Sequence, residues 1–148
     1  MYLLDTNVIS ELRKLGTARA DSNVTAWVNA ASADSFVISA VSVMEMQMGI
    51  HRIAHRGDVA QARLLEAWLH TYILPAFEGR ILPCDTAVAL QCAALHVPDP
   101  ASERDAWIAA TAMVHDLAVV TRNVADFQHS KVRIINPWEP TPQSGKQP

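Results

Sequence analysis

Four carboxylates occupy comparable places along the chain, each near the end of a short apolar run or the start of a helix: Asp5, Glu45, Asp105 and Asp126. Asp5 ends the apolar run that opens the chain, and Asp126 follows another such run by a few residues. We expect Glu45 and Asp105 in the first turns of two helices. Strand-to-helix turns of a parallel sheet emerge at one edge, where open α/β sheets bind their ligands. The four acids are therefore predicted to converge on one cleft.

Carboxylates brought together in this way need a compensating charge. Two of them about 5 Å apart repel by roughly 3 kcal/mol at an effective dielectric near 20, and several such pairs approach the whole stability of a domain. Either some of the acids hold protons or a divalent cation lies among them. A ligand set of oxygens, without nearby Cys or His, favours magnesium or manganese over zinc. The cleft is predicted to be a site for a hard cation.

Helix capping is the alternative role for two of these acids. Ser42-x-x-Glu45 and Ser102-x-x-Asp105 both fit a capping box or a close relative of it, and acids in a first helical turn are favoured by the helix dipole. Their neighbours argue for an inward orientation instead, because a capping acid normally faces solvent. The apolar stripes that include the two acids contain Val41, Met48 and Gly49 for Glu45, and Ile108, Ala109 and Ala112 for Asp105.

A set of motifs along most of the chain resembles the PIN-domain nucleases. The set comprises Leu3-Leu4-Asp5-Thr6-Asn7, Glu45, Asp105-Ala106-Trp107-Ile108-Ala109-Ala110, Thr121-Arg122-Asn123, Asp126-Phe127 and Asn136-Pro137-Trp138. The resemblance is strongest to the VapC and FitB toxins of bacterial type II toxin–antitoxin pairs, and it extends from residue 1 to about residue 138. The segment 97–102 lacks the glycine expected in relatives, and Trp107 is bulkier than the usual residue there.

The resemblance implies a Mg²⁺ site, with Mn²⁺ as a possible substitute, made by Asp5, Glu45, Asp105 and Asp126. It also implies that Asn7 supports this site and that Thr121 and Asn123 line the cleft or orient a carboxylate. The implied partners are an RNA substrate, a cognate antitoxin and a second copy of the chain, with a higher toxin–antitoxin assembly on DNA. A bound metal acidifies water and neutralises charge on phosphate. This chemistry suits a sequence without a Ser–His–Asp pattern or a phosphate-binding glycine loop.

The elements that must position these residues alternate between strand and helix. Strands are expected up to Leu4 and over 36–39, 80–83, 118–121 and 132–135, and helices over 6–13, 24–30, 43–54, from 57 to Pro75, from Asp85, and from Ser102 through 113. Ser22 and Ser42 are the predicted caps of the second and third helices. This alternation predicts an α/β fold of three layers, α/β/α, with a mainly parallel sheet.

Length and composition predict one packed domain. With 148 residues and 50% apolar content, we expect a single domain over 1–140, followed by a polar, disordered tail over 141–148. The net charge of −3 counts against a sequence-wide affinity for nucleic acid. Cys84 and Cys92 are expected in one helix as reduced core residues of a cytoplasmic protein. No secretory or membrane-spanning segment is apparent.

Several other side chains have a structural interpretation that we favour. His51 and His55 are spaced like zinc ligands, but without a third ligand we expect an exposed pair. Asp85 is expected to cap its helix. The three arginines 52, 56 and 63 are either solvated or bind phosphates. An apolar helix end is predicted to contribute to the core and to a dimer surface; it comprises Trp68, Leu69, Tyr72, Ile73, Leu74 and Phe77.

The predicted function is that of a Mg²⁺-dependent endoribonuclease toxin neutralised by a cognate antitoxin. One alternative is a non-catalytic binding module, whose acidic cleft serves a DNA-binding toxin–antitoxin repressor complex. Another is a metal-dependent phosphatase on a similar sheet. The full set of four acids favours an enzyme over the binding module, and the lack of an Asp-x-Asp nucleophile motif argues against the phosphatase.

Overall fold

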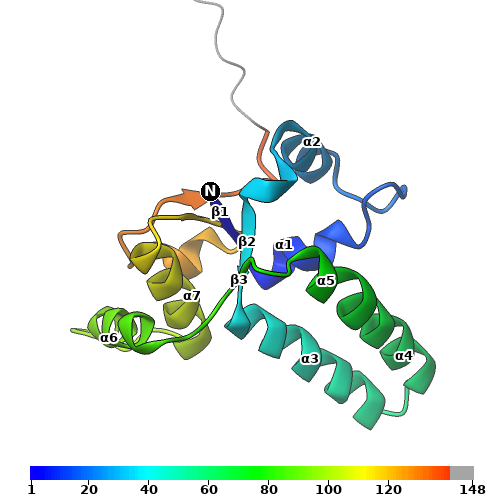
Figure 1. Ribbon diagram of the computed structural model, residues 1–148. Helices are drawn as coiled ribbons and strands as arrows, with labels where there is room; N and C mark the ends of the chain where they lie inside the picture. Colours follow the sequence, from blue (N-terminus) through cyan, green and yellow to red (C-terminus); the bar gives the residue numbers. More distant parts are fainter. Residues whose placement is uncertain (141–148) are drawn as a thin grey trace, which may run out of the picture.

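A parallel sheet forms the centre of the protein, in a computed structural model that describes residues 1–140 (Figure 1). The predicted tail, 141–148, lies outside these described residues. The strand order is β3-β2-β1-β4-β5, and every pair is parallel. The strands are β1 (Tyr2–Leu4), β2 (Phe36–Ser39), β3 (Ile81–Leu82), β4 (Ala118–Val120) and β5 (Ile134–Ile135).

Helices cover both faces of this sheet, which confirms the predicted three-layer α/β/α fold (Figure 1). The helical elements are α1 (Thr6–Leu12), α2 (Ser22–Ala30), η1 (Ala33–Ser35), α3 (Ala40–His55), α4 (Val59–Trp68), η2 (Leu69–Ile73), α5 (Leu74–Ala76), α6 (Thr86–Leu95), α7 (Glu103–Val114) and η3 (Val124–Phe127). None of the helices within residues 1–140 has the length and apolar character needed to cross a membrane.

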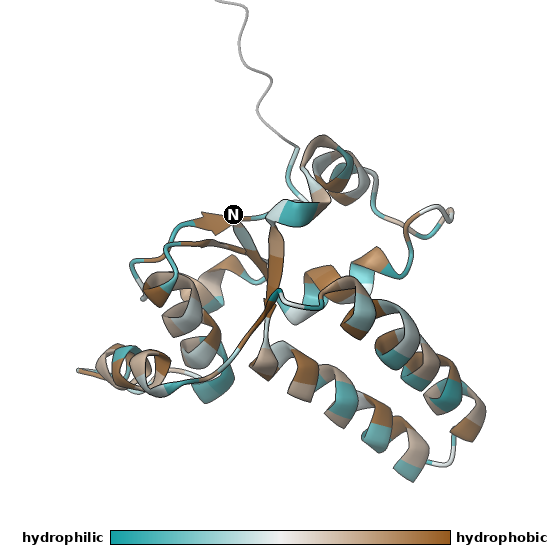
Figure 2. Cartoon of the chain, in the orientation of Figure 1, coloured by the Kyte–Doolittle hydropathy of each residue, from teal (hydrophilic) through white to brown (hydrophobic). Residues whose placement is uncertain are grey.

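Alternation along the central strands divides the core between the two faces. Leu4 and Val120 pack in a cluster with residues of α1, α3 and α4. Leu3 and Val119, one residue earlier in each strand, pack in a second cluster with α7. Successive side chains of a strand point to opposite faces, and strands buried on both sides are apolar almost throughout. Figure 2 shows this apolar character along the strands.

The start of α3 differs from the prediction. The helix begins at Ala40, directly after β2, and its cap is Ser39, whose hydroxyl accepts a hydrogen bond from the Val41 N–H. Ser42 is a buried helical residue and not a cap. Glu45 consequently lies in the second turn, not the first, which rules out the alternative of a capping box with Ser42. The apolar pattern does not distinguish a strand that passes directly into a helix from one followed by a loop.

Two further helix boundaries were wrongly predicted. The cap of α2 is Asp21, not Ser22, because the Asp21 carboxylate accepts from the N–H groups of Asn23 and Val24. Pro75 does not end the long helix, which continues through η2 into α5 and reaches Ala76. Its π-type turn carries a hydrogen bond from the Leu74 N–H to the Leu69 carbonyl. Such a widened turn shifts the carbonyls that a proline ring would otherwise meet.

Cys84 also differs from its prediction. It precedes α6 and is exposed, whereas Cys92 is buried within that helix. The run 80–83 forms a strand only over Ile81–Leu82, so the chain leaves the sheet before the cysteine. Pro83 has no N–H with which to extend a strand ladder.

Strand order places the ends of β1 and β4 at the topological switch point of the sheet. The chain builds β2 and β3 on one side of β1 and then crosses back to place β4 on its other side. Leu4 pairs with Val120, and the Asp5 N–H donates to the Val120 carbonyl at 2.9 Å. At such a switch point the connections leave in opposite directions, and open α/β sheets bind their ligands there, beyond the carboxyl ends of the strands. Asp5 and Thr121 are the first residues beyond those ends.

Candidate functional site

Asp5 is the most firmly held carboxylate at the switch point. Its side chain is 6% exposed, and it caps α1 by accepting from the Thr6 N–H at 2.8 Å. Its second oxygen accepts from the Thr121 hydroxyl at 2.8 Å and from the Asn7 amide at 3.2 Å. Both oxygens therefore have fixed directions, set by groups from two neighbouring strand ends.

A small hydrogen-bond network joins the residues that surround Asp5. The Asn7 amide donates to the Thr121 hydroxyl at 3.3 Å, and its carbonyl oxygen accepts from the Arg122 N–H at 3.2 Å. The Thr121 hydroxyl also accepts from the Asn123 N–H at 3.0 Å. Asn7 and Thr121 thus contact the carboxylate directly, whereas Asn123 reaches it through its backbone and the Thr121 hydroxyl.

Glu45 approaches the same cleft from α3. It accepts from the Thr6 hydroxyl at 3.2 Å and lies 3.6 Å from the Arg104 guanidinium. Its side chain is 23% exposed, whereas that of Arg104 is 46% exposed. The contact with Thr6 joins residues 39 positions apart, and nothing in the sequence pattern indicates it. Through this contact Arg104 links α7 to α3.

The other two acids come from the last third of the chain. Asp105 lies in the first turn of α7 and is half-buried, and Asp126 lies in η3 and is exposed. Ser102 occupies the cap position of α7, but its side chain makes no capping hydrogen bond to the backbone. Its hydroxyl instead hydrogen-bonds the Asp105 carboxylate and lowers the pKa of that group, so the usual capping box is incomplete.

The electrostatics show that the four acids form one cluster. Burial raises the pKa of Asp5, and Asp126 raises it further, against hydrogen bonds from Thr121, Thr6 and Asn7. Burial also raises the pKa of Glu45, with contributions from Asp5 and Asp105. The pKa of Asp105 is raised by burial, then by Asp126 and Asp5. Each carboxylate thus lies within electrostatic reach of two or more of the others.

The cluster is open and not a closed coordination sphere. Within residues 1–140, no three His, Cys, Asp or Glu side chains are arranged so as to hold one ion together. The donors are nonetheless hard oxygens, and Arg104 lowers the pKa of both Glu45 and Asp105. A cation in the cleft would relieve the remaining repulsion. The donor chemistry therefore fits Mg²⁺ or Mn²⁺.

The remaining candidate residues lie apart from this cluster. Asp85 caps α6 through the Val88 N–H, as predicted. His51 and His55 are exposed on α3, and Arg52, Arg56 and Arg63 are also exposed. Of the apolar helix end, Leu69, Ile73 and Phe77 are buried, Trp68 and Leu74 pack against the core, and Tyr72 is 63% exposed. Packing in the core therefore accounts for most of the apolar side chains at this helix end.

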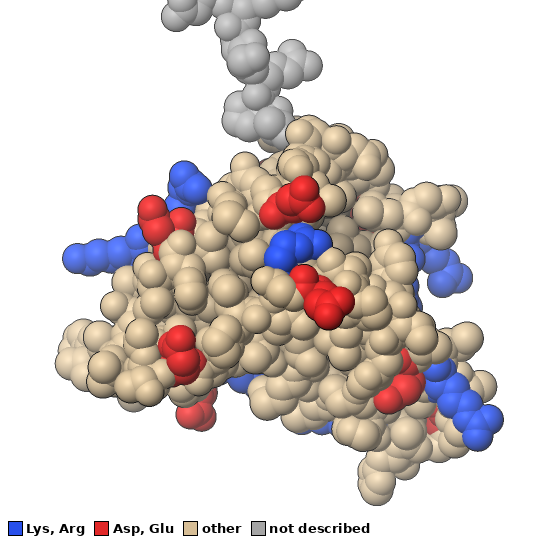
Figure 3. All heavy atoms as spheres, in the orientation of Figure 1, with Lys and Arg blue, Asp and Glu red and all other residues tan. Residues whose placement is uncertain are grey.

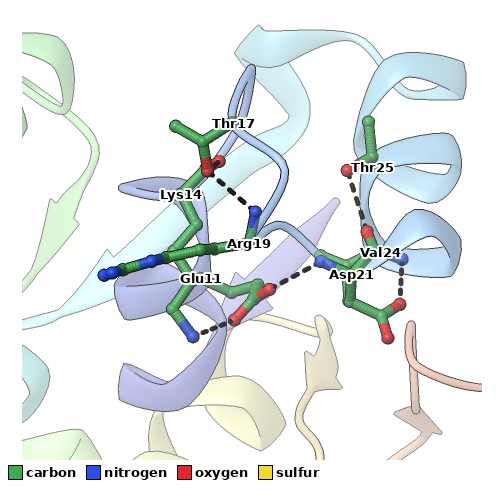
Figure 4. Close-up of polar contacts among 7 residues, drawn as sticks. All are labelled: Glu11, Lys14, Thr17, Arg19, Asp21, Val24 and Thr25. Carbon is green, nitrogen blue, oxygen red and sulfur yellow. Dashed lines mark hydrogen bonds and ion pairs between the residues drawn. The ribbon is translucent and has the colours of Figure 1, made fainter.

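Glu11 is a buried carboxylate that the sequence analysis did not identify. It is 7% exposed, accepts from the Asp21 N–H at 2.9 Å and pairs with Lys14 at 3.1 Å (Figure 4). These contacts join the end of α1 to the start of α2. These contacts explain Glu11 as a structural residue. The spacing of Glu11 and Lys14 in the sequence could have indicated their ion pair, because residues three positions apart lie on the same side of a helix.

Comparison with known proteins places this geometry in a family. The sequence model described as PIN domain matches residues 2–131. A VapC ribonuclease, Y4jK, from Sinorhizobium fredii is 37% identical over 95% of this chain and 99% of its own. Toxin FitB from Neisseria gonorrhoeae is 35% identical over 93% and 99%. A solved structure of FitAB bound to an IR36 DNA fragment superposes with a TM-score of 0.82 and 33% identity, covering 94% and 96% of the two chains. The chain therefore belongs to the PIN-domain family.

Proposed function

We propose that the chain is a Mg²⁺-dependent endoribonuclease, with Mn²⁺ as a substitute. Its metal ligands and catalytic groups would be Asp5, Glu45, Asp105 and Asp126. The observation that carries the proposal is the gathering of these carboxylates at the topological switch point, where the pKa of three of them is raised. The similarity to a VapC ribonuclease supports the same activity.

Each part of the cleft has a separate task in phosphodiester hydrolysis. A bound divalent cation supplies charge neutralisation at the phosphate and makes water easier to deprotonate, so no Ser or His nucleophile is required. Thr121, Asn7 and the Thr6 N–H fix the two oxygens of Asp5. Such groups behind a ligand set its orientation. Thr6 holds Glu45, and the half-exposed Arg104 is placed to contact an incoming phosphate.

We also propose that the chain is the toxin of a toxin–antitoxin pair, with residues 1–140 as its PIN-like domain. The similarity to toxin FitB and to a FitAB complex on DNA supports an antitoxin partner and a higher assembly on DNA. Exposed apolar side chains on α3 and α4, Met44 and Leu64, offer surface for the antitoxin or for a homodimer. Co-purification of the chain with a small basic protein would test the antitoxin proposal. The mass of the purified complex would show whether it contains two copies of this chain.

The proposed activity is tested by cleavage of a panel of structured RNAs with Mg²⁺ or Mn²⁺. Asp5→Asn is expected to lower the cleavage rate by about two orders of magnitude or more, since it removes a ligand charge. Asp116→Asn is the matched control, because Asp116 precedes β4 at the opposite edge of the sheet. Its φ of 53° suits asparagine. Full activity of Asp5→Asn would refute the catalytic assignment.

The binding-module alternative makes a different prediction in the same assay. If the cleft serves only a DNA-binding repressor complex, wild-type protein will cleave no RNA in either metal, yet its antitoxin complex will bind operator DNA. On the face of the described residues that Figure 3 shows, acidic and basic side chains are interspersed, without a continuous basic area. On this face the charged side chains therefore do not form an extended DNA-binding surface.

A further inference from the structure

A polar pocket of about 610 Å³ adjoins the acidic cleft at Asp126. One wall is the segment from Arg122 to Asp126, which follows β4, and the opposite wall comes from the chain after β5, including Asn136 and Glu139. The Arg122 N–H donates to Asn7, which contacts Asp5. The pocket is therefore joined to the proposed catalytic carboxylates by both a shared wall and a hydrogen bond.

The pocket presents amide groups that the described part of the protein does not use. Within residues 1–140, the side chains of Asn123 and Gln128 make no hydrogen bonds, although both line the pocket. The Asn136 side-chain carbonyl accepts from the Trp138 N–H at 3.0 Å, and its NH₂ group has no acceptor among those residues. Amide groups gathered in one concave site can read the polar edge of a planar ligand.

Two charged side chains define the kind of ligand. The Arg122 guanidinium lies over the Trp138 ring, 5.3 Å from its centroid, and neither it nor Glu139 forms an ion pair within residues 1–140. A guanidinium plane is a stacking surface for an unpaired RNA base. The Glu139 carboxylate, which is exposed at the rim, can accept two hydrogen bonds from adjacent donors.

We propose that this pocket binds a guanine base of the RNA substrate, next to the cleaved bond; the proposal rests on the proposed function above. Among the four bases of RNA, guanine presents two adjacent donors, N1–H and the N2 amine, that match both oxygens of a carboxylate. Its O6 and N7 accept from arginine or amide donors. Glu139 would thus read N1 and N2, the amides would read O6 and N7, and Arg122 would stack on the ring.

Substrates altered at single atoms test the assignment. Short single-stranded RNAs carrying one guanosine, or inosine in its place, differ only in the N2 amine that Glu139 is expected to bind. Wild-type protein with Mn²⁺ should cleave beside guanosine on the order of 10- to 100-fold faster than beside inosine, the range of one hydrogen bond to a charged group, since inosine retains N1–H. Glu139→Gln should bring the two rates together. Glu78→Gln, another exposed glutamate, is the control and should keep the difference.

A binding measurement separates failure of this proposal from failure of the proposed function. Asp5→Asn protein, with labelled forms of the same RNAs, should bind guanosine more tightly than inosine by fluorescence anisotropy, and adding Glu139→Gln should abolish the preference. If wild type cleaves RNA with equal rates beside guanosine and inosine, or prefers another base, the pocket assignment is wrong while the nuclease stands. If no RNA is cleaved, the proposed nuclease function fails. The assignment of the pocket to guanine is then tested only by whether guanosine RNA binds more tightly than inosine RNA.

Discussion

At the scale of the residue, Thr121 takes part through its hydroxyl in three hydrogen bonds at the switch point. Its hydroxyl is fully buried, donates to Asp5 and accepts from Asn7 and the Asn123 N–H. Removing the hydroxyl leaves these groups without their partner and frees the Asp5 carboxylate to rotate. Thr121 is therefore a positioning residue for the proposed metal ligand.

We predict that Thr121→Val lowers RNA cleavage by about 10- to 100-fold, the usual effect of removing a group that orients a ligand. The free energy of unfolding should fall by about 1–3 kcal/mol, because polar groups lose their partner in a buried site. Thr111→Val is the matched control. That threonine is also fully buried, but its hydroxyl donates to the Trp107 carbonyl within α7. The control should retain cleavage, and equal loss of activity in both variants would contradict the role of Thr121.

The repulsion among the carboxylates gives a second prediction at this scale. Asp126 raises the pKa of both Asp5 and Asp105, so Asp126→Asn should lower the pKa of both. Carbon-detected NMR titration of the side-chain carboxyl groups in metal-free protein measures this. Asp34→Asn, an exposed acid of η1, is the control. Unchanged titration of Asp5 and Asp105 in Asp126→Asn would place Asp126 outside the cluster.

At the scale of the element, Glu11 joins the end of α1 to the start of α2. Its buried carboxylate accepts from the Asp21 N–H, and Asp21 in turn caps α2 (Figure 4). The ion pair with Lys14 is partly exposed, and such pairs contribute little. The hydrogen bond between the Glu11 carboxylate and the backbone is therefore the more important contact.

Glu11→Ala should reduce the free energy of unfolding by about 2 kcal/mol, the range for a hydrogen bond to a charged group. Urea denaturation measures this, and hydrogen exchange should quicken in the segment 13–21 and the first turn of α2. Lys14→Ala, which removes only the ion pair, should change the free energy by less than about 1 kcal/mol. Equal effects of the two substitutions would mean that the ion pair, and not the backbone contact, is important.

At the scale of the whole molecule, the acidic cleft makes stability depend on pH and on cations. The pKa of Asp5, Glu45 and Asp105 is higher in the folded protein than in the unfolded chain. Between the unfolded and folded pKa of each group, the folded state binds more protons. The free energy of unfolding should therefore fall as pH rises from about 4 through the raised values.

We predict that metal-free protein loses stability over that pH interval and regains it when Mg²⁺ or Mn²⁺ is added at neutral pH. A cation at a hundredfold its Kd adds about 2.7 kcal/mol, which corresponds to a rise in Tm of roughly 5–10 °C for a chain of this size. Thermal melts at several pH values, with and without millimolar metal, measure both effects. Asp5→Asn should weaken the response to metal, whereas an unchanged wild-type Tm in metal would contradict the cation site.

The sequence by itself determined the layers of the fold and predicted a set of four acids near one edge of the sheet. Apolar runs that alternate with helical segments permit few arrangements other than a covered parallel sheet, and parallel connections place Asp5, Asp105 and Asp126 near one edge. Element boundaries were less predictable. Ser39 replaced Ser42 as the cap of α3, and the π-type turn carried the long helix through Pro75, because neither depends on apolar periodicity.

Only the tertiary structure decided the contacts that join distant segments. Thr6 with Glu45, Thr121 with Asp5 and Arg104 with Glu45 each connect residues on different elements. Strand order created these contacts by placing β1 between β2 and β4. Hydropathy specifies which face of each strand is buried, but not which strand lies beside it. The acids were therefore predictable as a set, whereas the groups that orient them, and the pocket beside Asp126, depend on how the strands are ordered.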